Sequence, residues 1–268
     1  MYEKFYGLKE DPFKITPDPD FLFLSKCHQE ALSYLLYGIK ERKGFIAITG
    51  DIGTGKTTLC RALLNRLDQN TKTAFILNSR LSDLQLLSAI VEDFCIKTKK
   101  NTKLSLLSAL NKFLLKELSS GNNVVLLIDE AQNLKNTSLE EVRLLSNLET
   151  EKEKLFQIVL VGQPELREKL NSPMLKQLRQ RISVRYHIHP LERQEVAQYI
   201  FHRLRVAGSD GSITFYDNAM DEIFKYSDGV PRLINILCDR ALLAGYVMET
   251  KNITIEIIQR CIKEIEAR

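Results

Sequence analysis

The 268-residue sequence predicts an α/β protein built on a parallel sheet, followed by a smaller all-helical domain. Up to Pro190, short apolar segments alternate with longer helical ones, which is the pattern of strands joined by crossover helices. Beyond Pro190 only helical periodicity remains. We therefore expect an extended N-terminal arm over residues 1–26, an α/β domain over 27–190 and a helical domain over 191–268.

Three prolines mark the N-terminal arm, which we expect to be extended. Pro12, Pro17 and Pro19 exclude a long helix because proline lacks an N–H donor and restricts the residue before it. Aromatic side chains along the same segment are expected to anchor it: Phe5, Phe13, Phe21 and Phe23. A helix is expected next, over residues 28–43, because apolar residues repeat there at four-residue steps.

The alternating part of the chain contains short apolar segments that we expect to be strands. They are Phe45–Thr49, Ala74–Asn78, Val124–Asp129, Gln157–Val161 and Val184–Ile188. Longer helical segments separate them, such as Lys103–Ser119, in which leucines recur on one face. The helical domain is expected to contain the helices Glu192–Ala207, Asp217–Tyr226, Pro231–Met248 and Thr254–Glu266.

The composition is that of an ordinary globular protein. The chain is 44% hydrophobic and 27% charged, and its 38 basic and 34 acidic residues give a net charge of +4. This charge is too mild to indicate an acidic partner such as nucleic acid. The five cysteines form no C-x-x-C pair, which argues against a disulfide framework or a zinc site. Since no apolar run approaches the roughly 20 residues that span a bilayer, we expect a cytoplasmic protein, neither exported nor membrane-spanning.

The strongest functional signal is a glycine-rich segment directly after the first strand. It consists of Gly50, Asp51, Ile52, Gly53, Thr54, Gly55, Lys56, Thr57 and Thr58, and it matches G-x-x-x-x-G-K-[ST] between a strand and a helix. The glycines let backbone N–H groups converge on a phosphate, and the helix that follows adds positive potential. Lys56 is expected to reach the β- and γ-phosphates, and Thr57 to offer its hydroxyl to Mg²⁺. The segment therefore predicts an ATP site.

Two acidic residues follow an apolar strand at the position where ligands of open α/β sheets bind. Asp129 and Glu130 stand at the carboxyl end of Val124–Asp129. Asp129 is placed to hold Mg²⁺ through water, and Glu130 to activate the water that attacks the γ-phosphate. The pair favours an ATPase over a kinase that acts on a small molecule, because such a kinase does not need it.

A glutamine and two arginines are less specific candidates. Gln163 follows the strand Gln157–Val161 and either orients the attacking water or belongs to a simple turn before Pro164. Arg179 and Arg181 precede the last strand, and either one is placed to contact phosphate charge from a neighbouring subunit. A solvated helix end would explain both arginines equally well.

The helical domain supplies one further candidate. Pro231 suits the first position of a helix, so that Arg232 would lie in the first turn. A cation there opposes the helix dipole unless something anionic is bound nearby. This conflict favours a binding role for Arg232.

Together these residues resemble an AAA+ ATPase. More narrowly, four segments are similar to the cytoplasmic ATPase domain of the general secretion pathway protein A (ExeA) family: residues 6–13, 16–25, 162–166 and 181–188. The resemblance implies a P-loop NTPase fold with a five-stranded parallel sheet in the order 5-1-4-3-2 and a C-terminal helical lid. It also implies that ATP is bound between the subunits of a ring or other oligomer.

The resemblance assigns roles to residues at matching motif positions. Gln163 matches the first sensor and Arg232 the second sensor. Arg181 matches the arginine finger, with Arg179 as the competing choice. The resemblance also implies that Pro12–Phe13 and His28–Gln29 lie near the adenine.

The leading functional hypothesis is an ATPase that uses ATP and Mg²⁺ to drive assembly of a bacterial envelope machine for secretion, pilus formation or exopolysaccharide export. The protein would be cytoplasmic, or the cytoplasmic domain of an inner-membrane protein whose membrane segment lies outside this chain. The alternative is an ATP-gated DNA-binding regulator like the ATPases of transposition. Scattered Lys and Arg residues alone support that alternative.

Overall fold

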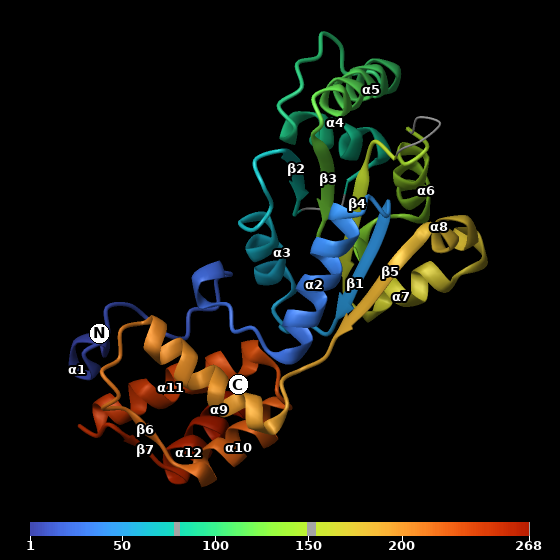
Figure 1. The fold of residues 1–268 in the computed structure, drawn as a ribbon. Coiled ribbons are helices and arrows are strands. Elements are labelled where there is room, and N and C mark those ends of the chain that lie inside the picture. The colour runs from blue at the N-terminus through green and yellow to red at the C-terminus, as the bar shows by residue number, and fades with distance from the viewer. Residues whose placement is uncertain (78–80, 149–153, 268) are drawn as a thin grey trace. The chain divides into compact units, whose positions relative to one another are not determined.

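The computed structural model describes residues 1–77, 81–148 and 154–267 (Figure 1). The chain forms two compact units, which we call the sheet unit and the helical unit. The sheet unit consists of Gln29–Asp51 and Cys60–Ile188. The helical unit consists of Met1–His28, Ile52–Leu59 and the residues from His189 onward.

The sheet unit is built on five parallel strands (Figure 1). They are β1 (Phe45–Gly50), β2 (Thr71–Ile76), β3 (Asn123–Ile128), β4 (Gln157–Gly162) and β5 (Ile182–Ile188). Their order is β2-β3-β4-β1-β5, which confirms the expected order 5-1-4-3-2. Each strand overlaps one of the predicted apolar segments, although β2 begins at Thr71, before the predicted start at Ala74. The predicted end of that segment, Asn78, lies outside the described residues.

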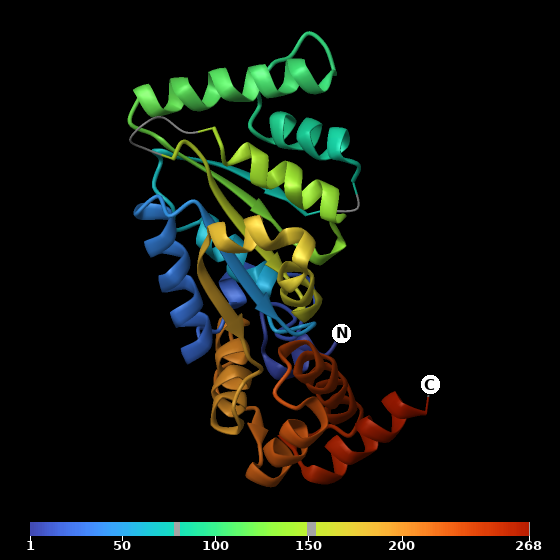
Figure 2. The ribbon, with the colours of Figure 1, turned by 90° about the vertical axis from the view of Figure 1, so that its right-hand side faces the viewer.

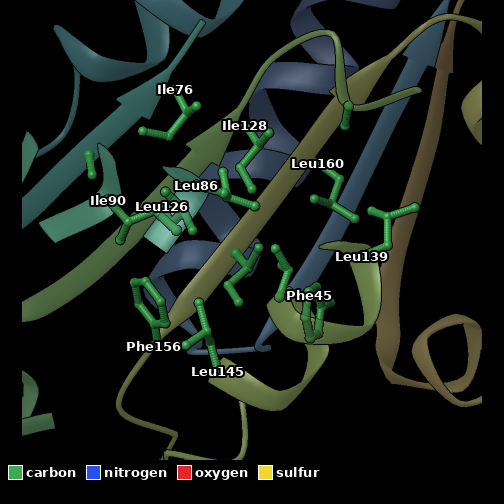
Figure 3. Close-up of a cluster of buried hydrophobic side chains, with 14 of the residues drawn as sticks. Phe45, Ile76, Leu86, Ile90, Leu126, Ile128, Leu139, Leu145, Phe156 and Leu160 are labelled. Carbon is green, nitrogen blue, oxygen red and sulfur yellow. The ribbon is translucent and has the colours of Figure 1, made fainter. Parts of the chain in front are cut away.

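Helices cover both faces of this sheet (Figure 2). They are α2 (Lys26–Lys40), α3 (Lys56–Leu64), α4 (Asp83–Asp93), α5 (Lys103–Ser119), α6 (Asn136–Leu145), α7 (Pro164–Asn171) and α8 (Lys176–Arg181), with the short 3-10 turns η2 (Ala131–Asn133) and η3 (Pro173–Leu175). On one face the core joins strand residues such as Phe45 and Leu126 to Ile90 of α4 and Leu139 of α6 (Figure 3). Burial of alternate strand residues on each face fixes the register of the sheet.

Local sequence signals set the boundaries of these helices. Ser82 and Gln85 form a capping box at the start of α4, in which each side chain satisfies a backbone N–H. Thr102 accepts a hydrogen bond from the backbone N–H of Ser105 at the start of α5. The buried leucines of α5 recur at the spacing of one helix face, which is why Lys103–Ser119 was predictable to the residue.

Over the residues that the structure describes, the helical unit contains four long helices and two very short strands. They are α9 (Arg193–Val206), α10 (Asp217–Ser227), α11 (Pro231–Val247), α12 (Ile255–Glu266), β6 (Thr214–Phe215) and β7 (Asn252–Ile253). The parallel pairing of β6 with β7 was not predicted after Pro190, because two residues are too few to show the alternation typical of a strand. Among the described residues, no helix is long and apolar enough to cross a membrane.

The N-terminal residues pack into the core of the helical unit. They contain a short helix, α1 (Glu3–Tyr6), and a 3-10 turn, η1 (Pro19–Phe21). The Tyr6 hydroxyl donates to the carbonyl of Leu242 at 2.9 Å. Arg203 is buried, donates to the carbonyls of Pro12 and Lys14, and lies over the ring of Phe21. Among the described residues, this buried guanidinium therefore has backbone carbonyls and an aromatic face as partners in place of a carboxylate.

Candidate functional site

The carboxyl ends of three neighbouring strands carry the predicted site residues of the sheet unit. Because β3, β4 and β1 are parallel and adjacent, their carboxyl ends meet at one edge of the sheet (Figure 1). Gly50 ends β1, Asp129 follows β3 directly, and Gln163 follows β4 directly. This edge is where ligands of open parallel sheets bind.

The acid pair is held in an unusual backbone conformation. Asp129 is only 2% exposed, and its backbone N–H donates to the carbonyl of Ile76 at 2.9 Å. Its carboxylate Oδ1 accepts the backbone N–H of Glu130 at 2.8 Å. Glu130 has a φ of +51°, in the left-handed region that non-glycine residues seldom adopt. Such strain concentrates at functional sites. Here the backbone conformation determines the direction in which the Glu130 side chain extends.

Two glutamines hold the carboxylate of Glu130. Its Oε2 accepts one hydrogen bond from Nε2 of Gln132 at 2.5 Å and one from Nε2 of Gln163 at 2.9 Å. Gln132 Oε1 in turn accepts the backbone N–H of Gln163 at 3.1 Å. The structure thus brings Glu130 and Gln163 together and adds Gln132, which the sequence analysis missed. The sequence signal that could have identified Gln132 is its position two residues after Glu130.

The glycine-rich segment is a loop that leads from β1 into α3. Gly50 is the last residue of β1, and Lys56, Thr57 and Thr58 are the first residues of α3. Lys56 is 6% exposed. A buried ammonium at the positive end of a helix is favourable when an anion binds there, as the phosphate-loop pattern requires.

Within the helical unit, α11 approaches the loop at Gly53. The backbone N–H of Arg232 donates to the carbonyl of Gly53 at 3.2 Å. Gly53 has a φ of +83°, and a Cβ there would lie 2.7 Å from Cβ of Arg232. Glycine is therefore required at this position by both conformation and space. Pro231 takes the first position of α11, as predicted, and the side chain of Arg232 is exposed.

A buried histidine supports the loop from a second side within the helical unit. His28 is 3% exposed, and its Nε2 lies 2.9 Å from the carbonyl oxygen of Thr54. Its Nδ1 lies 2.7 Å from the hydroxyl of Ser25. Burial lowers the pKa of His28, so the neutral ring donates from Nε2 and accepts the Ser25 hydroxyl at Nδ1. The prediction that placed His28 near adenine did not anticipate this contact with the loop backbone.

The two arginines of α8 have different surroundings. Arg181 donates from Nη1 to the hydroxyl of Ser146 at 2.6 Å and to the carbonyl of Arg143 at 3.4 Å. It therefore satisfies the carboxyl end of α6 in its own chain. The backbone carbonyl of Arg179 accepts from Nη2 of Arg185 at 2.5 Å, and its guanidinium has no hydrogen bond to the residues that the structure describes.

The donor chemistry of the predicted Mg²⁺ residues fits the ion. Thr57 offers a hydroxyl and Asp129 a carboxylate, and hard oxygen donors are what Mg²⁺ prefers. Over residues 1–77, 81–148 and 154–267 there is no cluster of three or more His, Cys, Asp or Glu side chains that could hold a metal ion. Magnesium does not need such a cluster, because it commonly takes one or two protein ligands and completes its shell with phosphate oxygens and water.

Comparison with known proteins identifies the fold and the family. Residues 39–170 match the model of the AAA domain. General secretion pathway protein A of Aeromonas hydrophila is 47% identical to the chain over 247 residues, which cover 92% of this chain and 45% of that protein. This chain is an AAA-domain protein related to general secretion pathway protein A. The chain thus spans about half the length of the Aeromonas protein.

Solved structures with low sequence identity share the fold of this AAA protein. Cdc6p of Pyrobaculum aerophilum has a TM-score of 0.73 at 18% identity, covering 96% of this chain and 71% of that chain. ORC2 of Aeropyrum pernix, in ADPNP–ADP complexes, has a TM-score of 0.70 at 17% identity, with coverages of 96% and 72%. RuvB of Thermotoga maritima has a TM-score of 0.56 at 18% identity, with coverages of 88% and 67%.

Proposed function

We propose that the chain binds ATP with Mg²⁺ and hydrolyses it. The phosphate loop, residues 50–58, binds the triphosphate through its backbone N–H groups and Lys56, while Thr57 and Asp129 hold Mg²⁺. The ion supplies charge neutralisation on the phosphate oxygens. The observation that best supports this proposal is the carboxylate of Glu130, which two amides fix at the sheet edge where β1 continues into the phosphate loop.

Glu130 is the general base of the proposed reaction. Its carboxylate accepts a proton from the attacking water, and Gln163, which donates to the same carboxylate, helps to orient that water. General-base catalysis contributes roughly 10²–10⁴-fold to the rate. The amides around Glu130 fix its rotamer before a substrate arrives, which reduces the entropy lost in reaching the transition state.

The test of this proposal is the substitution Glu130→Gln. It preserves the size of the side chain and removes its basicity, so we expect kcat to fall at least about 100-fold while ATP still binds. Phosphate release and the binding of a fluorescent ATP analogue measure the two quantities. The matched control is Glu165→Gln in the first turn of α7, where the glutamate is exposed and turnover is expected to persist. Unchanged turnover in Glu130→Gln would refute the assignment of the base.

We also propose that the active form is an oligomer in which an arginine of one subunit contacts ATP held by the next. Arg181 is the leading choice and Arg179 the competitor, while Arg232 acts from α11 on ATP of its own chain. Growth to a defined oligomer in ATP and Mg²⁺, measured by light scattering, tests this proposal. If Arg179→Ala loses turnover while Arg181→Ala keeps it, the arginine that contacts ATP of the neighbouring subunit is Arg179 and not Arg181.

The proposed biological role is ATP-driven assembly of a bacterial envelope machine at the cytoplasmic face of the membrane. This role is supported by the 47% identity to general secretion pathway protein A over most of this chain. Restoration of secretion by this chain's residues 1–268, fused in place of the matching region of the Aeromonas protein, tests the proposed role. The Glu130→Gln form of the same fusion is expected to fail.

A further inference from the structure

We propose that Gln132 is a positioning residue that sets both Glu130 and Gln163 for ATP hydrolysis without touching ATP. This inference rests on the proposed ATPase function, and it concerns a residue to which neither the phosphate-loop pattern nor the acid pair gives a role. Gln132 lies in the 3-10 turn η2, directly after the acid pair. Its side chain contacts each of the two residues that we assign to the attacking water.

The first observation is the arrangement of donors around Glu130. Both glutamine amides donate to the same carboxylate oxygen, Oε2, at 2.5 Å and 2.9 Å. Two donors on one oxygen fix the rotation of the carboxylate, and this rotation determines how the carboxylate meets the attacking water. Loss of the Gln132 donor would remove one of the two amides that hold this oxygen.

The second observation is that Gln132 also holds Gln163. Its Oε1 accepts the backbone N–H of Gln163, the residue directly before α7, at 3.1 Å. The Gln132 side chain thus connects the turn after β3 to the turn after β4. It fixes the backbone of Gln163, from which the Gln163 side chain extends to Glu130. Both ends of the Gln132 amide are used, so the position requires an amide rather than a carboxylate or an apolar group.

The third observation is that neighbouring residues fix the place of Gln132 itself. Lys169 of α7 donates from Nζ to the carbonyl of Gln132 at 2.6 Å and to that of Leu134 at 2.7 Å. Gly162 leaves the space that the side chain uses, since a Cβ there would lie 2.7 Å from Gln132 Oε1. A lysine anchor on the backbone and a glycine beside the amide together leave this side chain one well-defined position.

The central test is Gln132→Leu, which keeps a similar side-chain volume and removes both the donor and the acceptor. We expect kcat for ATP to fall about 10- to 100-fold while KM changes less than about twofold, because the lost contacts act on the base and not on ATP. Asn133→Ala, an exposed neighbour in the same turn, is the matched control and is expected to keep wild-type turnover. A kcat within twofold of wild type in Gln132→Leu overturns the proposal.

A double-mutant comparison separates positioning from a general loss of structure. If Gln132 acts through Glu130, adding Gln132→Leu to Glu130→Gln lowers the residual kcat by less than about twofold. A residue needed only for folding would lower it by the full factor seen in the single variant. Equal effects in both backgrounds therefore contradict the proposal.

A third measurement does not depend on hydrolysis, so it also decides the case in which the wild-type chain turns over no ATP. In protein labelled with ¹⁵N-glutamine, we expect Gln132→Leu to shift both the backbone and the side-chain amide signals of Gln163, whereas Asn133→Ala leaves them in place. Unmoved Gln163 signals in Gln132→Leu refute the positioning role. Shifted signals in a chain without turnover support the arrangement and refute the ATPase proposal instead.

Discussion

The phosphate loop and the Glu130 carboxylate, at the carboxyl end of β3, are held in place by different kinds of contact. In the helical unit, the loop is supported through its main chain: His28 binds the carbonyl of Thr54, and the backbone of Arg232 binds that of Gly53. In the sheet unit, the carboxylate of Glu130 is held by the side-chain amides of Gln132 and Gln163. Phosphate binding by backbone N–H groups depends on the conformation of the main chain. The position of a carboxylate depends on its side-chain rotamer and on its hydrogen-bond donors.

This difference teaches which property each region controls. Because its supports act on the backbone, a change beside the phosphate loop alters the loop's shape and therefore nucleotide affinity and stability together. A change among the amides alters the position of the Glu130 carboxylate and not the shape of the phosphate loop, so it acts on kcat. The comparison fails if loop variants lower kcat alone or if amide variants weaken ATP binding.

The largest effect within the loop is expected for Gly53→Ala. The positive φ and the 2.7 Å approach of Arg232 Cβ both penalise a side chain, and Arg232 Cβ cannot move aside without shifting the start of α11. We expect a loss of about 2–3 kcal/mol in the free energy of unfolding and at least tenfold weaker ATP binding. Denaturant titration and a fluorescent ATP analogue measure these losses.

Gly211→Ala is the control for that experiment. Gly211 also has a positive φ, of +87°, but a Cβ there would meet no atom within 4 Å. We therefore expect only the cost of the backbone conformation, about 1 kcal/mol, and unchanged ATP affinity. Equal effects of the two substitutions would mean that the approach of α11 to Gly53 is unimportant.

A smaller effect is expected at His28, where the support is a single side chain. His28→Ala leaves the carbonyl of Thr54 without this donor and opens a cavity, at a cost of about 2 kcal/mol. His28→Gln, whose amide can donate from a similar position, is expected to recover part of the stability and of the ATP affinity. Thermal unfolding and nucleotide titration of the two variants measure this, and equal losses in both would contradict a role for the Nε2 donor.

The same histidine predicts a pH dependence with a definite sign. Burial lowers the pKa of His28, so the unfolded chain takes up a proton as the pH falls through about 6.5 while the folded chain does not. The stabilising contribution is therefore complete above pH 6.5 and is lost on acidification below it. Between pH 7 and pH 5.5, wild-type Tm should fall more than that of His28→Gln. Burial also lowers the pKa of His202, which is present in both proteins and cancels in the difference.

The features that could be predicted from the sequence are those that repeat or that follow a fixed spacing. All five strands follow from apolar runs, and the start of the phosphate loop follows from its glycines. Placing Asp129 and Gln163 after neighbouring strands followed from the resemblance, which supplied the strand order that the structure confirms. The roles of Lys56, Asp129, Glu130 and Arg232 remain predictions.

The supporting contacts could not be predicted, because each joins residues that are distant in the chain or generic in type. The sequence does not show that Gln132 contacts Gln163, because the two residues come together only through the pairing of β3 with β4. His28 binds Thr54 across 26 positions of sequence. Arg181 matched a motif position, and its hydrogen bond to Ser146 carries no sequence signal at all. Sequence patterns thus located the chemical groups, and tertiary packing determined what holds them.

The smallest effect separates the two arginines of α8. Because Arg181 satisfies Ser146 and the carbonyl of Arg143, Arg181→Ala is expected to cost about 1 kcal/mol, or about 2–4 °C in Tm, even without nucleotide. Arg179→Ala, which removes no such contact among the described residues, should lower Tm by less than about 1 °C. Differential scanning calorimetry without ATP measures both. An Arg181→Ala protein as stable as wild type would show that this side chain is not committed to α6 and is available to a neighbouring subunit.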